Sequence, residues 1–182
     1  MADKSQPDAI AMLKADHRKV EELFARFESA KGVQKKQDLV GQICKELTIH
    51  TILEEDIFYP SCRDKVEDDL LDEAFVEHDG AKVLIAELES GQPDEAFYDA
   101  KVKVLSEQID HHVKEEEKPS EGIFSQAREA KLDMDELASA MRARKEELMV
   151  KFKDGLPKPE TKTFSGPQLE NRPPEESATK KD

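Results

Sequence analysis

The sequence predicts an all-α protein: an up-down-up-down antiparallel four-helix bundle with one additional C-terminal helix and a disordered tail. Apolar residues recur at alternating steps of three and four along four long segments, the pattern of helices that share a bundle core. Glycine and proline separate the segments by short connections, so successive helices should be antiparallel. The 182-residue chain has only 7 glycines, and its β-branched residues form no alternating runs, which argues against a sheet.

The boundaries of the helices are predicted from residues that disfavour helix. The four bundle segments are expected at residues 8–31, 34–59, 66–90 and 93–118. Their ends are marked by Gly32, Pro60, Gly91 and Pro119. Pro93 suits the first turn of the fourth helix, because a proline there removes no helical hydrogen bond. A fifth helical pattern covers residues 123–151.

The chain is expected to form one domain over residues 1–154, followed by a flexible tail over residues 155–182. Five of the nine prolines lie between Pro157 and Pro174, among lysine, glutamate, serine and threonine. So few apolar residues cannot bury enough surface to offset the entropy of ordering the chain. We therefore expect no fixed structure in the tail.

The charge of the chain narrows the classes of partner. The formal net charge is −14, from 42 acidic and 28 basic residues, and such a surface repels nucleic acid and anionic lipid. No apolar run approaches the roughly 20 residues that span a bilayer, and residues 1–7 lack the apolar stretch of a secretory signal. Cys44 and Cys62 are read as reduced, partly buried thiols. We expect a cytoplasmic monomer or weak homo-oligomer that binds neither nucleic acid nor membrane.

Each of the four bundle seams contains one histidine: His17, His50, His78 and His112. His17 and His50 are about equally far from the first turn, near Gly32, and His50 and His78 are equally far from the second, near Asp64. In antiparallel helices, equal distances mean equal heights. His112 is several residues further from the third turn than His78 is, and a longer non-helical loop would absorb part of this difference.

Two seams also carry a glutamate one turn after the histidine, Glu54 and Glu116. A carboxylate in an apolar core costs several kcal/mol unless it has a partner, and these seams carry no lysine or arginine. A lone histidine on an apolar seam is usually a hydrogen-bonded core residue, but four histidines with two glutamates favour a pair of metal ions. The predicted ligands are His17, His50, Glu54, His78, His112 and Glu116.

Neighbouring residues offer alternatives to these ligands. The seam period selects His112 over His111 and Glu116 over Glu115, and His111 is expected to face solvent or to support the site from outside. Glu21 follows His17 by one turn but lies beside the seam, so a solvated face is the simpler interpretation.

The pattern also predicts the orientation or role of four further side chains. Glu55 and Glu117 are expected to point outward. Tyr59 and Tyr98 lie near predicted helix ends, where they could hydrogen-bond to the site, although aromatic residues in such places usually serve packing.

The sequence resembles the hemerythrin-like family, whose module is also called the HHE cation-binding domain, over roughly residues 8–128. The residues that carry the resemblance are Asp16-His17, His50 to Glu55 with Phe58-Tyr59-Pro60, Glu77-His78, and His111 to Glu117. The resemblance implies a non-haem di-iron centre with an oxo or hydroxo bridge. It implies that Glu54 and Glu116 bridge the two metals and that the histidines are terminal ligands.

Two features depart from the family pattern. Oxygen-carrying hemerythrins have a second histidine one turn after the first in the third helix, where this chain has Lys82. The site would then have an open coordination position, which weakens the case for reversible oxygen carriage. Pro119 interrupts the usual continuation of the fourth helix and should let the fifth segment fold back over the bundle.

The leading functional hypothesis is therefore a non-haem di-iron protein that binds or reacts with O₂, peroxide or NO. Six nitrogen and oxygen ligands suit two iron ions; manganese would also fit, and zinc less well. The first alternative is an iron- or redox-sensing binding module without turnover. The second is a purely structural bundle that holds no metal.

Overall fold

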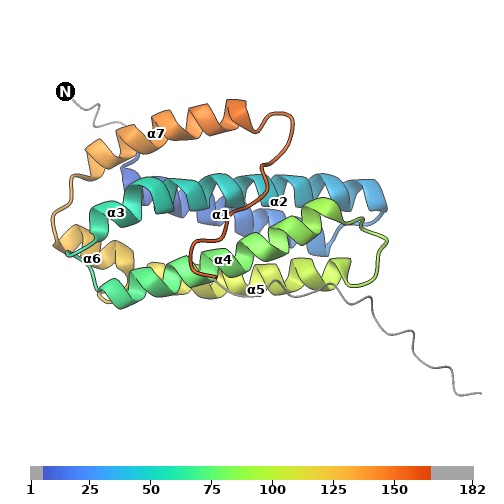
Figure 1. Ribbon diagram of the computed structural model, residues 1–182, viewed down its shortest axis with the longest axis horizontal. Coiled ribbons are helices and arrows are strands. Elements are labelled where there is room, and N and C mark those ends of the chain that lie inside the picture. The colour runs from blue at the N-terminus through green and yellow to red at the C-terminus, as the bar shows by residue number, and fades with distance from the viewer. Residues whose placement is uncertain (1–5, 165–182) are drawn as a thin grey trace, which may run out of the picture.

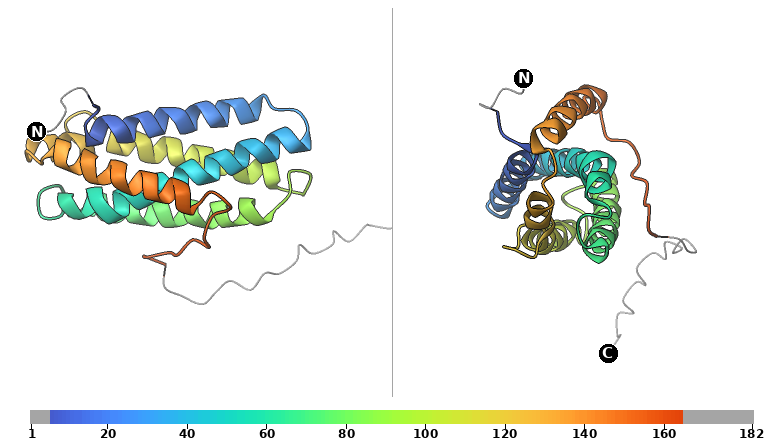
Figure 2. Two further views of the ribbon diagram at one scale, coloured as in Figure 1. Left: turned by 90° about the horizontal axis from the view of Figure 1, so that it is seen from above. Right: turned by 90° about the vertical axis from the view of Figure 1, so that its left-hand side faces the viewer.

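The computed structural model describes residues 6–164, and this part of the chain contains helices and loops but no strand. The bundle helices are α1 (Ala9–Glu28), α2 (Val33–Leu53), α4 (Asp68–Ser90) and α5 (Tyr98–Glu116). They run alternately up and down around a common core (Figures 1 and 2). The predicted all-α four-helix bundle is confirmed.

The second bundle helix is longer than predicted and has an irregular end. It continues from α2 through a π-helical turn, η1 (Glu54–Phe58), into a short helix, α3 (Tyr59–Cys62). Pro60 was expected to end the helix, but it lies in the first turn of α3, where its missing N–H costs nothing. The wider π turn changes the angular spacing of side chains, and both Glu54 and Glu55 are buried there.

The fourth helix begins at Tyr98 instead of Pro93. Phe97, which precedes it, has a φ of 68°, a left-handed conformation that an α-helix cannot include. The chain between Ser90 and Tyr98 is therefore a non-helical loop. Such a loop is what the greater distance of His112 from this turn requires.

The predicted fifth helix is two helices, α6 (Ile123–Glu129) and α7 (Met134–Lys151). The expected single helix was wrong because Lys131 has a φ of 57°, which breaks the helix between them. A new N-cap then starts α7, where the Asp133 side chain accepts a hydrogen bond from the backbone N–H of Glu136. α7 packs along α1 and α2 on the outside of the bundle (Figure 2).

The apolar core is divided into two clusters by a layer of buried polar residues. Along α1, Leu13 belongs to one cluster and Val20 to the other, and His17 lies between them. The first cluster includes buried residues of α3, α6 and α7, and the second fills the opposite end of the bundle. The polar layer is thus enclosed by apolar side chains on both sides.

The segment after α7 crosses the bundle over α2 and α4 (Figures 1 and 2). Asp79, which is fully buried, accepts hydrogen bonds from the backbone N–H groups of Lys162 (2.8 Å) and Thr163 (2.6 Å) and from the Thr163 hydroxyl (2.8 Å). Residues 155–164 therefore contact the bundle, and the rest of the predicted tail lies outside the described residues. Within the described residues, no helix combines the length and apolar character needed to cross a membrane.

Candidate metal centre

The four seam histidines meet at one level of the bundle, one from each long helix. Their Nε2 atoms form two close pairs, His17 with His50 at 3.1 Å and His78 with His112 at 3.2 Å. All four side chains are buried. Close pairs of buried imidazole nitrogens need either a shared proton or a cation between them.

Glu54 and Glu116 span the two histidine pairs. Glu54 Oε2 lies 3.1 Å from His50 Nε2 and 3.3 Å from His78 Nε2. Glu116 Oε2 lies 3.3 Å from His17 Nε2 and 3.6 Å from His112 Nε2. Each carboxylate thus reaches one histidine of each pair, which is the geometry of a bridging ligand between two centres.

Two carboxylate oxygens in this layer are buried without a hydrogen-bond partner in the described part of the chain. They are Glu54 Oε1 and Glu116 Oε2. Buried carboxylate oxygens without donors are costly, and a bound cation would satisfy them. The six predicted ligands therefore fit a metal ion, and their potential ligand atoms form two overlapping groups, His17-His50-Glu54-Glu116 and Glu54-His78-His112.

Tyr59 places its hydroxyl at the centre of this layer. The hydroxyl donates a hydrogen bond to Glu116 Oε1 (2.7 Å) and lies 3.3 Å from Glu54 Oε2 and 3.5 Å from His78 Nε2. Burial and then the charges of Glu116 and Glu54 raise the pKa of this phenol well above its usual value. Sequence reasoning placed Tyr59 near the site but gave no reason to choose it over Tyr98, which lies in the other apolar cluster.

Each candidate histidine ligand also faces a carboxylate through its second ring nitrogen. His17 Nδ1 is 2.8 Å from Glu117, His78 Nδ1 is 3.1 Å from Glu55, and His112 Nδ1 is 2.7 Å from Glu77. The fourth contact, between His50 Nδ1 and Asp16, is longer at 3.8 Å. At the three shorter contacts, the carboxylate holds the proton at Nδ1 and leaves the Nε2 lone pair free to bind a metal.

The four carboxylates form a ring around the bundle with three hydrogen-bonded contacts and one longer contact, because His50 Nδ1 has no hydrogen-bond partner within the described residues. In each contact the carboxylate and the histidine come from different elements. The carboxylate following α5 contacts the histidine of α1, and the carboxylate of α1 faces the histidine of α2. The carboxylate of η1 contacts the histidine of α4, and the carboxylate of α4 contacts the histidine of α5. Each supporting residue is also the chain neighbour of a candidate ligand, as in the pairs Asp16-His17, Glu54-Glu55, Glu77-His78 and Glu116-Glu117.

The outward orientation predicted for Glu55 and Glu117 was therefore wrong. Both bind an imidazole on another helix, and Glu55 is only 6% exposed. A feature of the sequence could have predicted these contacts, because an acidic residue lies next to a candidate ligand in each of the four segments. The seam period places these acidic residues on a flanking face of the helix, so it does not predict that they reach the site.

Lysine and arginine side chains neutralise this ring from outside. Lys145 of α7 binds Asp16 (2.5 Å), and Lys82 and Lys162 bind Glu55 (2.8 and 2.9 Å). Although burial opposes ionisation, hydrogen bonds from His78, Lys82 and Lys162 lower the pKa of Glu55 to about 2. Lys82, at the position of the missing histidine, is thus turned to Glu55 and Asp79.

Without metal, the pKa values of two of these histidines, His50 and His78, are raised. Burial disfavours the charged imidazole of His50, but the Glu54 carboxylate and Asp16 outweigh it and raise its pKa to about 10. Burial is likewise outweighed at His78, where Glu54 and Glu55 raise the pKa to about 9. The layer therefore attracts positive charge, which protons or metal ions can supply.

The other residues weighed from sequence lie outside this layer. The His111 ring is 62% exposed. Glu21 is 40% exposed and pairs with Arg18 on its own helix. Cys44 and Cys62 are free thiols buried in the apolar clusters.

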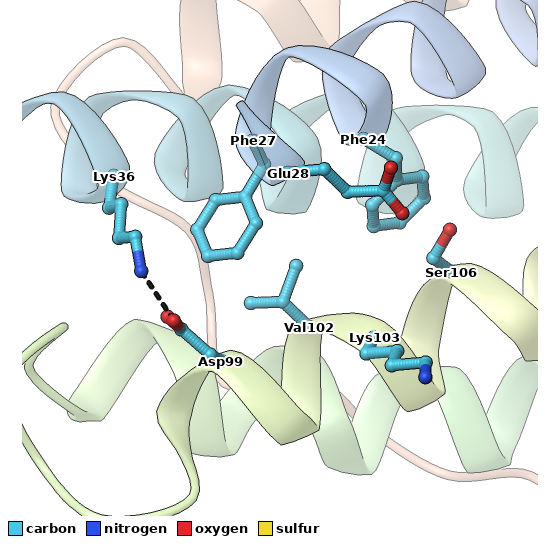
Figure 3. A pocket seen from close by; sticks show the side chains of 8 residues that line it. All are labelled: Phe24, Phe27, Glu28, Lys36, Asp99, Val102, Lys103 and Ser106. Carbon is cyan, nitrogen blue, oxygen red and sulfur yellow. Dashed lines mark hydrogen bonds and ion pairs between the residues drawn. The ribbon is translucent and has the colours of Figure 1, made fainter. Parts of the chain in front are cut away.

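Two cavities are lined by residues of α1 and α5, and the smaller one is also lined by residues of α2 and α4. A small one, about 10 Å³, lies against the four histidines and is lined on its apolar side by Val20, Leu47, Ile109 and Val113. A larger one, about 220 Å³, contains none of the candidate ligands; Phe24 and Val102 line it, and the Lys36–Asp99 ion pair closes one side (Figure 3). Phe24 follows Val20 by one helical turn on α1.

Comparison with known proteins gives a family match and a curated relative. The family model of the hemerythrin HHE cation-binding domain matches residues 8–119. A curated protein from Nostoc sp., described as a DNA nickase, is 29% identical over 116 residues, or 64% of this chain and 33% of that protein. The chain thus spans about a third of the length of that relative.

A solved structure shares the fold. It is a crystal structure of a hemerythrin HHE cation-binding domain-containing protein from Mycobacterium kansasii, with a TM-score of 0.69 and 23% sequence identity, covering 80% of this chain and 90% of that one. The family match extends over more than half of the chain and includes all six candidate ligands. The chain therefore belongs to the hemerythrin HHE cation-binding domain family.

Proposed function

We propose that this chain is a non-haem di-iron protein that binds or reacts with O₂, peroxide or NO. The observation that carries the proposal is the arrangement of two imidazole pairs spanned by two carboxylates. His17, His50, Glu54, His78, His112 and Glu116 would hold the two ions, with the glutamates as bridges. Iron bound there would supply redox and ligand-binding chemistry toward small oxidants.

The chain's own residues would tune this chemistry. The ring of supporting carboxylates orients each imidazole and makes it a better donor. Val20, Leu47 and Ile109 line the cavity beside the histidines and exclude water from it. The Tyr59 hydroxyl holds a proton 2.7 Å from Glu116 Oε1, where it can be donated to a small ligand or retained.

The alternative function is an iron or redox sensor without turnover. The contacts of Lys145 and Lys162 favour it, because they join α7 and the C-terminal segment to carboxylates that hold His50 and His78. A change in the metal centre would then alter the contacts of α7 and of the C-terminal segment, both of which lie outside the four-helix bundle.

We do not extend DNA nicking to this chain. Two thirds of the nickase relative has no counterpart here, and a net charge of −14 disfavours binding to a polyanion. We therefore expect no measurable retention on DNA at physiological salt.

Metal analysis with an optical spectrum tests the central proposal. Protein loaded with Fe²⁺ without oxygen and then oxidised should hold about two irons per chain and show near-ultraviolet oxo-bridge bands. Glu54→Gln should lower the iron content, whereas Glu46→Gln, the same change on α2 at a residue paired with Lys19, should leave it unchanged. One zinc per chain, or equal iron in both variants, would contradict the proposal.

Peroxide consumption separates the two functions. Sustained turnover by the iron-loaded protein, absent from His50→Ala, supports an oxidant-consuming enzyme. A single stoichiometric oxidation that then stops supports the sensor.

A further inference from the structure

A narrow cavity between α4 and α5 is lined both by surface residues and by residues of the candidate metal centre. Its volume is about 10 Å³. On its outer side lie Glu73, which is exposed, and Glu77 and Glu115, which are partly exposed. On its inner side lie two candidate ligands, His112 and Glu116, which are buried.

Two of the glutamates that line this cavity belong to a second group of potential metal ligands. Glu73 and Glu77 lie one turn apart on α4, and His111 faces them from α5. Their ligand atoms all lie within 4.8 Å of one another, and His111 Nε2 is 3.5 Å from Glu77 Oε1. Two carboxylates and one imidazole are suitable ligands for a divalent transition metal.

The inner end of the cavity is lined by a residue of the candidate metal centre. Glu116 Oε2 is buried and has no hydrogen-bond partner in the described chain, yet Glu116 lines this cavity. Glu77 connects the two ends, because its Oε1 faces His111 while its Oε2 accepts a hydrogen bond from His112 Nδ1 (2.7 Å).

The charge around the cavity also favours cations. Among the described residues that line it, four are glutamates and none is lysine or arginine. By contrast, the lining of the cavity of about 260 Å³ between α2 and α4 is balanced in charge, because it contains three lysines and three acidic residues. Of these two cavities, the one between α4 and α5 has the negative charge that concentrates positive ions.

We propose that Glu73, Glu77 and His111 form a transit site that captures Fe²⁺ at the surface and delivers it to His112 and Glu116. A cavity of about 10 Å³ holds about one water molecule, so a hydrated ion must lose water before it passes. The three surface ligands replace part of that water shell, and the inner ligands replace the rest without any change of oxidation state. The proposal rests on the di-iron centre proposed above.

The test is the rate at which metal-free protein takes up metal. Wild type and a Glu73→Gln/His111→Gln variant are mixed with limiting Co²⁺, an optical probe, and separately with Fe²⁺ without oxygen, and uptake is followed by stopped flow. We expect the variant to load about tenfold more slowly and to reach the same final metal content. Glu22→Gln, an exposed carboxylate on α1, is the control and should load at the wild-type rate.

The outcomes are distinct. Equal rates in the variant, the control and wild type, with full final loading, would overturn the transit site and leave the di-iron proposal standing. A fall in the final metal content of the variant would assign these residues to the centre itself and also overturn the transit site. Failure of wild type to bind either metal would overturn the di-iron proposal.

Discussion

Replacing Tyr59 with phenylalanine should destabilise the metal-free protein far more than the loss of one hydroxyl usually does. The Tyr59 hydroxyl is the one hydrogen-bond donor to Glu116 Oε1 within the described residues. The other oxygen of this carboxylate, Oε2, already lacks a hydrogen-bond partner. Tyr59→Phe would therefore leave a buried carboxylate without any hydrogen bond.

The size of the effect follows from that count. A hydrogen bond to a charged group contributes about 1.5–3 kcal/mol, and stranding a buried acceptor adds a desolvation cost. The free energy of unfolding should fall by about 2–3 kcal/mol, with little cavity cost because the ring remains. In a domain of this size that corresponds to a melting temperature lower by roughly 5–10 °C.

Tyr98→Phe is the matched control. Tyr98 is also buried, at 4% exposed, but it packs in the other apolar cluster, and its hydroxyl makes no hydrogen bond to the described residues. Its removal should cost less than about 0.5 kcal/mol. Urea unfolding of both variants in the presence of a chelator measures the difference, and equal losses would refute the assignment of Tyr59 to the polar layer.

Three further perturbations test other parts of the structure. In the metal-free protein, the pKa of His50 is raised to about 10 and that of His78 to about 9. Their protonated forms therefore stabilise the fold fully below pH 6.5, and this contribution to the free energy of unfolding is lost as pH rises toward 10. The free energy of unfolding should therefore fall as pH rises through this range, by roughly 1 kcal/mol per pH unit for each histidine; a urea midpoint that does not change between pH 6.5 and 9 would contradict this. Truncation after Thr161 removes three donors to the buried Asp79 and should cost about 1–3 kcal/mol, measured by calorimetry against the full chain. Leu148→Ala, in the buried face of α7, should cost about 2–5 kcal/mol if α7 folds with the bundle; a variant as stable as wild type would show that α7 is independent.

The parts of the fold that could be predicted from sequence are those set by local periodicity. The heptad-like seams placed His17, His50 and His78 at one level, because short turns fix the height of residues in antiparallel helices. The same seams distinguished His112 from His111, and the structure buries the first and exposes the second.

The parts that could not be predicted depend on contacts between distant segments. The π turn that buries Glu55 with Glu54 has no signature in the helical period. Glu117 contacts the polar layer because its carboxylate accepts a hydrogen bond from His17 of α1. The helical period of its own segment does not predict this contact. Similarly, residues 155–164 have the composition of a linker, and their contacts with distant residues such as Asp79 and Glu55 place them on the bundle.

The adjacency of ligands and supporting carboxylates has a mechanical consequence. Neighbouring residues of a helix differ by about 100° around its axis, so Asp16 and His17 face two different helices at once. If a helix rotated about its axis, its histidine would leave the metal centre. Its supporting carboxylate would also move away from the histidine of the neighbouring helix. The ring thus acts as a rotational lock in which each helix fixes the orientation of the next, and a vacant centre could retain the spacing of its ligands before any metal arrives.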